Sequence, residues 1–136
     1  MEIIGVESRS RTQFIDVTAQ VRAAVKKSGV KSGVCMLFVP HTTAAVTINE
    51  NADADVTRDI LMELEKIVPP EDNYAHGERN SDAHIKSSLV GCQLSVLVEK
   101  GTLVLGTWQG IYFCEFDGPR SRKLYVKVMS DDQESR

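Results

Sequence analysis

Aromatic residues, cysteine and histidine are all scarce in this chain. Of its 136 residues 6% are aromatic, and there are three cysteines, three histidines and one tryptophan. The core must therefore be built mainly from Val, Ile and Leu. The cysteines, Cys35, Cys92 and Cys114, are odd in number, lie far apart and form no C-x-x-C pair. This pattern favours a reduced, cytoplasmic compartment over the disulfide scaffold of a secreted protein.

An excess of basic residues and a long hydrophobic run are also missing. The 16 Lys and Arg against 19 Asp and Glu give a net charge of −3, which argues against nucleic-acid binding. Glu2 stands where a signal peptide would be basic, and the apolar run from Val34 to Val39 is too short to cross a bilayer. We therefore expect no membrane partner. A nucleic-acid interface would need the following residues to share one face: Arg9, Arg11, Lys26, Lys27 and Lys31.

Common catalytic signatures are absent as well. The sequence contains no G-x-S-x-G elbow, no P-loop, no G-x-G-x-x-G and no H-E-x-x-H. Cys35 lies in an apolar run without an adjacent base, which argues against a thiol nucleophile.

What is present is typical of one globular domain. The chain is 42% apolar and 26% charged, and residues 1–136 fit a single domain, with 130–136 expected to form a frayed tail. Apolar and alternating runs predict strands. These strands are expected over 2–8, 13–17, 34–39, 44–48, 94–99, 102–105, 111–116 and 123–129. The continuous run from Val34 to Val39 is typical of a strand buried on both faces.

Two main helices are predicted between the strands. The first spans Thr18 to Ser28 and stops at Gly29; the second spans Asp53 to Ile67 and stops before two prolines. A short third helix is expected from Asp82 to Leu89. Strands outnumber helices and lie close together in the sequence. The predicted fold is therefore α+β, with mainly antiparallel, sandwich-like sheets and the helices packed against them.

The three histidines all lie in polar segments at the ends of predicted elements. His41 follows the Val34–Val39 run, while His76 and His84 bracket a polar loop. Three converging imidazoles could hold a divalent metal, Zn or Mg, with an open position for a substrate oxygen. Each histidine taken alone is better explained as an ordinary surface or loop residue.

Acidic, hydroxyl and basic side chains supply further candidates. Glu50 and Asp53 could act as acid or base, although capping of the second helix explains Asp53 equally well. Arg120 and Arg122 follow a tight Asp-Gly-Pro turn and could bind a phosphate, although exposed arginines are common. The remaining candidates for substrate contacts are Thr42, Thr43, Ser87, Thr107 and Gln109.

Taken together, these segments resemble one family. The order His41-Thr42-Thr43, Asn49 to Asp53, His76 to His84, Gly106 to Gln109 and Asp117 to Arg120 is similar to that of the YjbQ family, UPF0047, also called the secondary thiamine-phosphate synthase family. The resemblance spans essentially the whole chain. One departure is Arg79, which stands where many members have glycine.

The resemblance implies a homotrimer with a pocket for a divalent metal and an anion. It assigns His41, His76 and His84 as metal ligands, and Glu50 and Asp53 as acid/base or supporting groups. The implied anion contacts are Thr107, Gln109, Arg120 and Arg122. Family members are associated with weak thiamine-phosphate synthase activity, which joins a pyrimidine diphosphate to a thiazole phosphate.

Two functions are therefore open. The first is a small metal-dependent enzyme that acts on a phosphorylated small molecule, with thiamine-phosphate synthesis as a side activity. The second is a non-catalytic homotrimer that binds an anionic metabolite.

Overall fold

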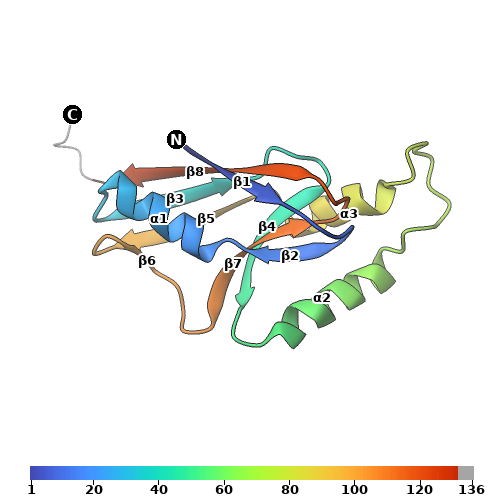
Figure 1. Ribbon diagram of the computed structural model, residues 1–136, viewed down its shortest axis with the longest axis horizontal. Helices are drawn as coiled ribbons and strands as arrows, with labels where there is room; N and C mark the ends of the chain where they lie inside the picture. The colour runs from blue at the N-terminus through green and yellow to red at the C-terminus, as the bar shows by residue number, and fades with distance from the viewer. Residues whose placement is uncertain (132–136) are drawn as a thin grey trace.

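The computed structural model describes residues 1–131, which form two antiparallel sheets and three helices (Figure 1). The elements follow in the order β1 (Glu2–Glu7), β2 (Gln13–Asp16), α1 (Thr18–Ser28), β3 (Gly33–Phe38), β4 (Ala44–Glu50), α2 (Ala54–Ile67), α3 (Ser81–Val90), β5 (Gln93–Glu99), β6 (Thr102–Leu103), β7 (Gln109–Glu115) and β8 (Ser121–Ser130). The larger sheet has the order β1-β8-β3-β5-β6 and the smaller one β2-β7-β4. The predicted α+β class and the short third helix are confirmed.

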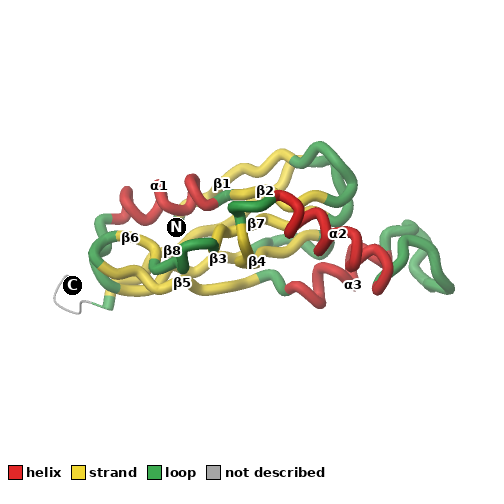
Figure 2. Tube along the Cα trace, turned by 90° about the horizontal axis from the view of Figure 1, so that it is seen from below, coloured by secondary structure: helices red, strands yellow, loops and turns green. Residues whose placement is uncertain are grey.

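Helix α1 covers the inner face of the larger sheet. In the tube view α1 lies along the sheets (Figure 2). Val21 and Val25 of the helix are buried in a core that includes Leu37 and Val126 of the larger sheet. The helix ends as predicted, because Gly29 adopts φ 72° and its backbone N–H donates to the carbonyl of Lys26. The core therefore lies between α1 and the sheets.

Helix α2 lies outside this core, beside the smaller sheet (Figure 1). Asp53 caps it, and its side chain accepts a hydrogen bond from the backbone N–H of Asp55 at 2.9 Å. Although the helix carries an apolar stripe, none of its residues is fully buried, and Ile67 is 64% exposed. No helix within residues 1–131 is long and apolar enough to cross a membrane.

The expectation that Val34 to Val39 is buried on both faces is wrong for the isolated chain. In β3, Cys35 and Leu37 are buried on the inner face, but Phe38 on the other face is 40% exposed. Neither α1 nor the smaller sheet covers this second side, which we call the outer face. Its apolar residues, aligned by strand register, are Ile3, Val34, Met36, Phe38, Leu97, Tyr125 and Met129.

Candidate functional site

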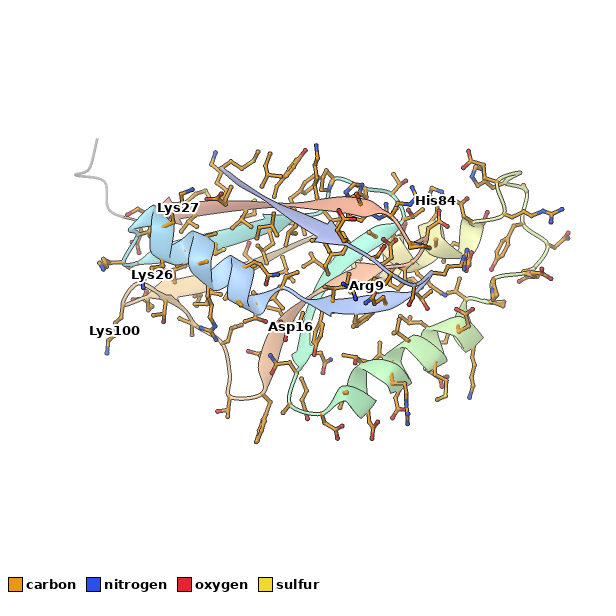
Figure 3. All side chains as sticks on the ribbon, viewed as in Figure 1. Arg9, Asp16, Lys26, Lys27, His84 and Lys100 are labelled. Atoms are coloured by element: carbon orange, nitrogen blue, oxygen red, sulfur yellow. The ribbon has the colours of Figure 1, made fainter. Side chains whose placement is uncertain are left out.

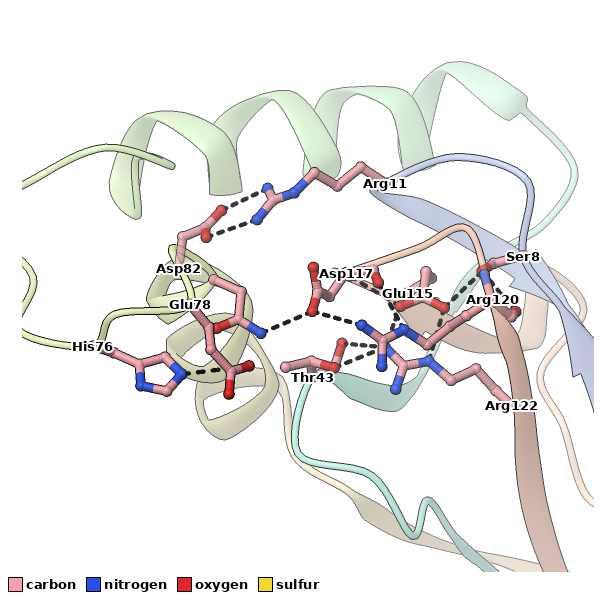
Figure 4. A network of polar contacts seen from close by, with 11 residues as sticks. Ser8, Arg11, Thr43, His76, Glu78, Asp82, Glu115, Asp117, Arg120 and Arg122 are labelled. Carbon is pink, nitrogen blue, oxygen red and sulfur yellow. Dashed lines mark hydrogen bonds and ion pairs between the residues drawn. The ribbon is translucent and has the colours of Figure 1, made fainter.

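A buried ion pair joins β7 to β8 where the two strands approach their connecting turn (Figure 4). Arg122 is 4% exposed and Glu115 is fully buried. The Nε atom of Arg122 donates to Oε1 of Glu115 at 2.9 Å, and its Nη2 atom donates to the other carboxylate oxygen. Nη2 also donates to the hydroxyl of Thr43 at 2.8 Å. These bonds fix the plane of the guanidinium group.

Glu115 is also held from two other directions. Ser8 donates its hydroxyl to Glu115 at 2.7 Å, and the backbone N–H of Asp117 donates at 2.9 Å. Burial alone would raise the pKa of Glu115, but the hydrogen bonds from Arg122, Asp117 and Ser8 outweigh burial and hold the pKa below its ordinary value. The carboxylate is therefore ionised, as its pairing with Arg122 requires.

An open cavity of about 470 Å³ lies over this ion pair. Arg122 lines this cavity, and its Nη1 atom has no hydrogen-bond acceptor within residues 1–131. Arg120 lies at the same cavity, and its Nε and Nη2 atoms donate to Asp117, each at 2.9 Å. The other lining residues are Phe38, Val39, Pro40, His41, Thr42, Thr43 and Cys92.

His41 forms one wall of this cavity. Its Nε2 atom accepts a hydrogen bond from the backbone N–H of Lys123 at 2.9 Å. Burial lowers the pKa of His41, and the positive charge of Arg122 lowers it further. The ring is therefore neutral at pH 7, and its proton resides on Nδ1 because Nε2 is the acceptor. His41 can thus act as a hydrogen-bond donor to a ligand.

The other two histidines lie together: His76 is in the loop before α3, and His84 is in the first turns of α3. The rings of His76 and His84 meet edge to face, with centroids 5.4 Å apart. Asn80, between them in sequence, donates from Nδ2 to Asp117 at 2.9 Å, whereas its Oδ1 atom is buried and has no hydrogen-bond partner among residues 1–131. A buried acceptor of this kind is satisfied when a ligand or water donates to it.

Within one chain, the three histidines do not form a metal site. No group of three or more His, Cys, Asp or Glu side chains in the described residues could hold a metal ion. His76 and His84 are suitably close to one another, but the Nε2 lone pair of His41 is occupied by Lys123. The Zn or Mg site therefore stays a prediction, and it would need additional ligands.

The remaining acidic and polar candidates lie at the far end of β4. Ala44, next to the cavity residue Thr43, pairs with Glu115, while Glu50 pairs with Gln109. Six residue steps of an extended strand span about 20 Å. The structure thus separates Glu50, Asp53, Thr107 and Gln109 from the His41 cavity of the same chain.

A hydrogen-bonded loop presents the single tryptophan at this far end. The backbone N–H of Asn51 donates to the carbonyl of Trp108 at 3.0 Å, and the backbone N–H of Gly106 donates to the side chain of Gln109 at 2.8 Å. The same loop contributes Thr107 to a second polar cavity, of about 400 Å³. Despite these bonds, Trp108 is 63% exposed. The loop holds a large aromatic side chain in water.

Several of the polar candidate residues stabilise the fold instead of lining the cavity. Ser87 is buried and donates to the carbonyl of Ala44 at 2.6 Å, which ties α3 to β4. Asp53 caps α2, as the capping interpretation predicted. Arg79 adopts φ 62°, a left-handed conformation that favours glycine, the residue that the resemblance led us to expect at this position.

The sequence-based reasoning did not find Ser8, Glu115 or a second buried network under α3. Glu115 carries a local signal, because it is the one charged residue in the apolar run 111–116. In the second network, Lys86 is buried, with its Nζ atom 2.5 Å from Glu65 and 3.8 Å from Asp82. Arg11 donates to both carboxylate oxygens of Asp82, at 2.9 and 3.0 Å. This network ties α2 and the β1–β2 loop to α3.

The basic residues considered for a nucleic-acid interface lie in different parts of the fold where the structure places them. Arg9 lies apart from Lys26 and Lys27, which are at the end of α1 (Figure 3). Arg11 is engaged by Asp82.

Comparison with known proteins decides the family. A family model described as UPF0047 protein YjbQ-like matches residues 2–131. The chain belongs to the YjbQ family. It is 49% identical to UPF0047 protein MJ1081 of Methanocaldococcus jannaschii over 126 residues, covering 93% of this chain and 91% of that protein. It is 48% identical to UPF0047 protein YugU of Bacillus subtilis over 130 residues, covering 95% and 98%.

Solved structures agree with this YjbQ assignment. A YjbQ/UPF0047 protein of Clostridium acetobutylicum superposes with a TM-score of 0.94 at 53% identity, covering 95% of this chain and 100% of that one. A protein of unknown function from Sulfolobus solfataricus superposes with a TM-score of 0.92 at 34% identity, covering 96% of each chain. The YjbQ family is one whose function is not established, so the chemistry has to be argued from the site.

Proposed function

We propose that this YjbQ-family protein is a small enzyme that acts on a phosphorylated small molecule bound in the His41 cavity. The observation that carries the proposal is the guanidinium group of Arg122, which lines the cavity, is fixed by Glu115 and Thr43, and has no acceptor for Nη1 within residues 1–131. An arginine whose orientation is fixed in advance loses little conformational freedom when it binds an anion, and its planar donors suit phosphate.

The neighbouring groups suit the same ligand. Arg120 adds a second positive charge, and His41 adds a neutral donor on Nδ1. The hydroxyls of Thr42 and Thr43 lie beside them. In the weak thiamine-phosphate synthase activity that we propose as a side reaction, these donors would stabilise the negative charge of a departing diphosphate.

We also propose a divalent metal, Zn or Mg, with His76 and His84 as its ligands from this chain. The proximity of their rings supports the pair, and the unpartnered Asn80 oxygen marks a nearby acceptor. When bound, such a metal would polarise a phosphoryl or carbonyl oxygen.

The homotrimer is supported by the uncovered outer face of the larger sheet. Ile3, Phe38 and Leu97 are all exposed there by 40% or more, alongside partly covered Met36 and Tyr125. A contiguous group of exposed apolar side chains is typical of a protein–protein interface. Copies of the chain that pack through this face would bury it.

The test of phosphate binding is titration calorimetry with inorganic phosphate and pyrophosphate. Arg120→Ala should weaken binding at least several-fold, whereas the matched exposed variant Arg9→Ala should leave it unchanged. Equal affinities for wild type and Arg120→Ala would refute the proposed site. Metal content measured in wild type, His76→Ala and His84→Ala tests the metal separately, and unchanged content in both variants would remove it.

A non-catalytic homotrimer that binds an anionic metabolite is the second candidate. It is favoured by the position of Glu50 and Asp53 at the far end of β4, which leaves the His41 cavity of the same chain without either acid/base candidate. A screen of phosphorylated compounds distinguishes the two functions. Tight binding without product in wild type, with Glu50→Gln indistinguishable from it, would favour the binding protein.

A further inference from the structure

We infer that the His41 cavity is completed by the Trp108 loop of a second copy of this chain. By the Trp108 loop we mean residues 106–109. The inference deepens the proposed function and rests on it, because it names the partner of the same cavity. It explains why chemically similar candidates are found at opposite ends of β4.

The first observation is that hydrogen bonds hold the backbone of the Trp108 loop while the Trp108 side chain stays largely exposed in the single chain. Asn51 and Gln109 fix its backbone, as described above, yet Trp108 is 63% exposed and Thr107 is also exposed. Tryptophan is enriched at the buried centres of protein interfaces. A hydrogen-bonded loop that presents tryptophan to solvent in the single chain is suited to insertion into a partner.

The second observation is that the cavity is open where such a loop could enter. Arg120 is half exposed, and Thr42 and Cys92 on the cavity wall are exposed. A phosphate ester bound there would remain largely hydrated unless something covered it. A covering tryptophan would exclude water, which strengthens the charged hydrogen bonds beneath.

The outer face of the larger sheet has exposed apolar residues beside the Trp108 loop and also beside the His41 cavity. Near the Trp108 loop, Leu97 and Val104 are exposed at the β5–β6 edge of the larger sheet. At the cavity, Phe38 stacks on Tyr125, which pairs with Ile3 of the opposite edge strand β1. Two different surfaces would therefore meet, which makes the contact heterologous. Heterologous contacts close into a ring when the rotation between neighbouring copies is a whole fraction of a turn, and a trimer is such a ring.

Charge also matches a second copy of the chain to this position. The β4–α2 end that carries the Trp108 loop exposes Asp53 and Asp55. The cavity end exposes Arg120 and Lys123. Opposite charges on the two surfaces favour this pairing and disfavour contact between like ends.

The experiment is cross-linking between Cys92, which lines the cavity, and a cysteine placed in the Trp108 loop. In the single chain these positions lie at opposite ends of β4, so a link between them must join two copies. Thr107→Cys and Gln109→Cys are each treated with a short bis-maleimide and separated on a denaturing gel. We expect covalent dimers and trimers with at least one variant, and their loss when Cys92→Ser is added.

Asp59→Cys, exposed on α2, is the matched control and should give monomers. Monomers from both loop variants, or links that persist with Cys92→Ser, would overturn the inference. The result is independent of ligand binding: cross-linking without phosphate binding would refute the proposed function alone. Phosphate binding without cross-linking would refute the composite site alone. A second readout is Trp108→Ala, which should weaken inorganic phosphate binding several-fold without changing its stoichiometry.

Discussion

Replacement of Arg122 by methionine should be among the most destabilising single changes in the chain. Methionine keeps much of the side-chain length but removes the charge, and Glu115 is then buried with only Ser8 and the Asp117 N–H as donors. Breaking a buried ion pair from one side costs about 3–5 kcal/mol. Since a typical domain is stable by roughly 5–15 kcal/mol, Arg122→Met should bring the protein near unfolding.

The assay is urea unfolding followed by circular dichroism at one fixed protein concentration, because an oligomer gains stability with concentration. The double variant Arg122→Met/Glu115→Leu removes both charges and should recover most of the loss. Arg120→Met is the matched control, since its ion pair with Asp117 is half exposed and is worth about 0–1 kcal/mol. A loss below about 1 kcal/mol for Arg122→Met, or a double variant no more stable than the single one, would refute the reasoning.

Three further predictions concern pH, a helix cap and a strained residue. Because hydrogen bonds hold the pKa of Glu115 below its ordinary value, its stabilising effect is complete above about pH 4.3 and is lost as the pH falls through the lowered pKa. Acid unfolding of Arg122→Met/Glu115→Leu should therefore depend less steeply on pH below 4 than that of wild type, and equal slopes would contradict this. Asp53→Ala should cost about 0.5–2 kcal/mol in urea unfolding, because the N–H of Asp55 loses its partner; Asp59→Ala, in mid-helix, is the control. Arg79→Gly should raise the melting temperature by relieving the φ of 62°, and a lowered value would show that the loop does not need that conformation.

Local patterns predicted most of the secondary structure. The alternation of Leu124, Val126 and Val128 with polar residues indicated β8, and these side chains do face the core. Lysines in the last turn of α1 and Gly29 after it indicated where that helix ends. Such signals could be read because they depend on residues close together in the sequence.

Which face of a strand is covered by another part of the protein could not be predicted in the same way. The run Val34 to Val39 is apolar throughout, but the sequence does not say whether the second face is covered by the same chain. In the structure Phe38 stacks on Tyr125 at a face that α1 does not reach. An apolar residue there suits an interface between copies as well as it suits a core.

The site was predicted only in part for a related reason. His41 and Glu50 are close in sequence, but the extended strand between them carries them to opposite ends of β4. Arg122 was a candidate anion contact with an exposed arginine as the alternative, and its burial against Glu115 could not be predicted, because it depends on how the turn at Gly118 and Pro119 carries the chain from β7 in the smaller sheet to β8 in the larger one. Contacts made across turns and between strands are set by the whole fold.

Anomalous diffraction from crystals soaked in tungstate, a heavy analogue of phosphate, tests anion binding in the His41 cavity most directly. The account predicts that the strongest peak lies in this cavity, within hydrogen-bond reach of Nη1 of Arg122. Peaks confined to other basic side chains, such as Lys26 and Lys27 at the end of α1, would contradict it.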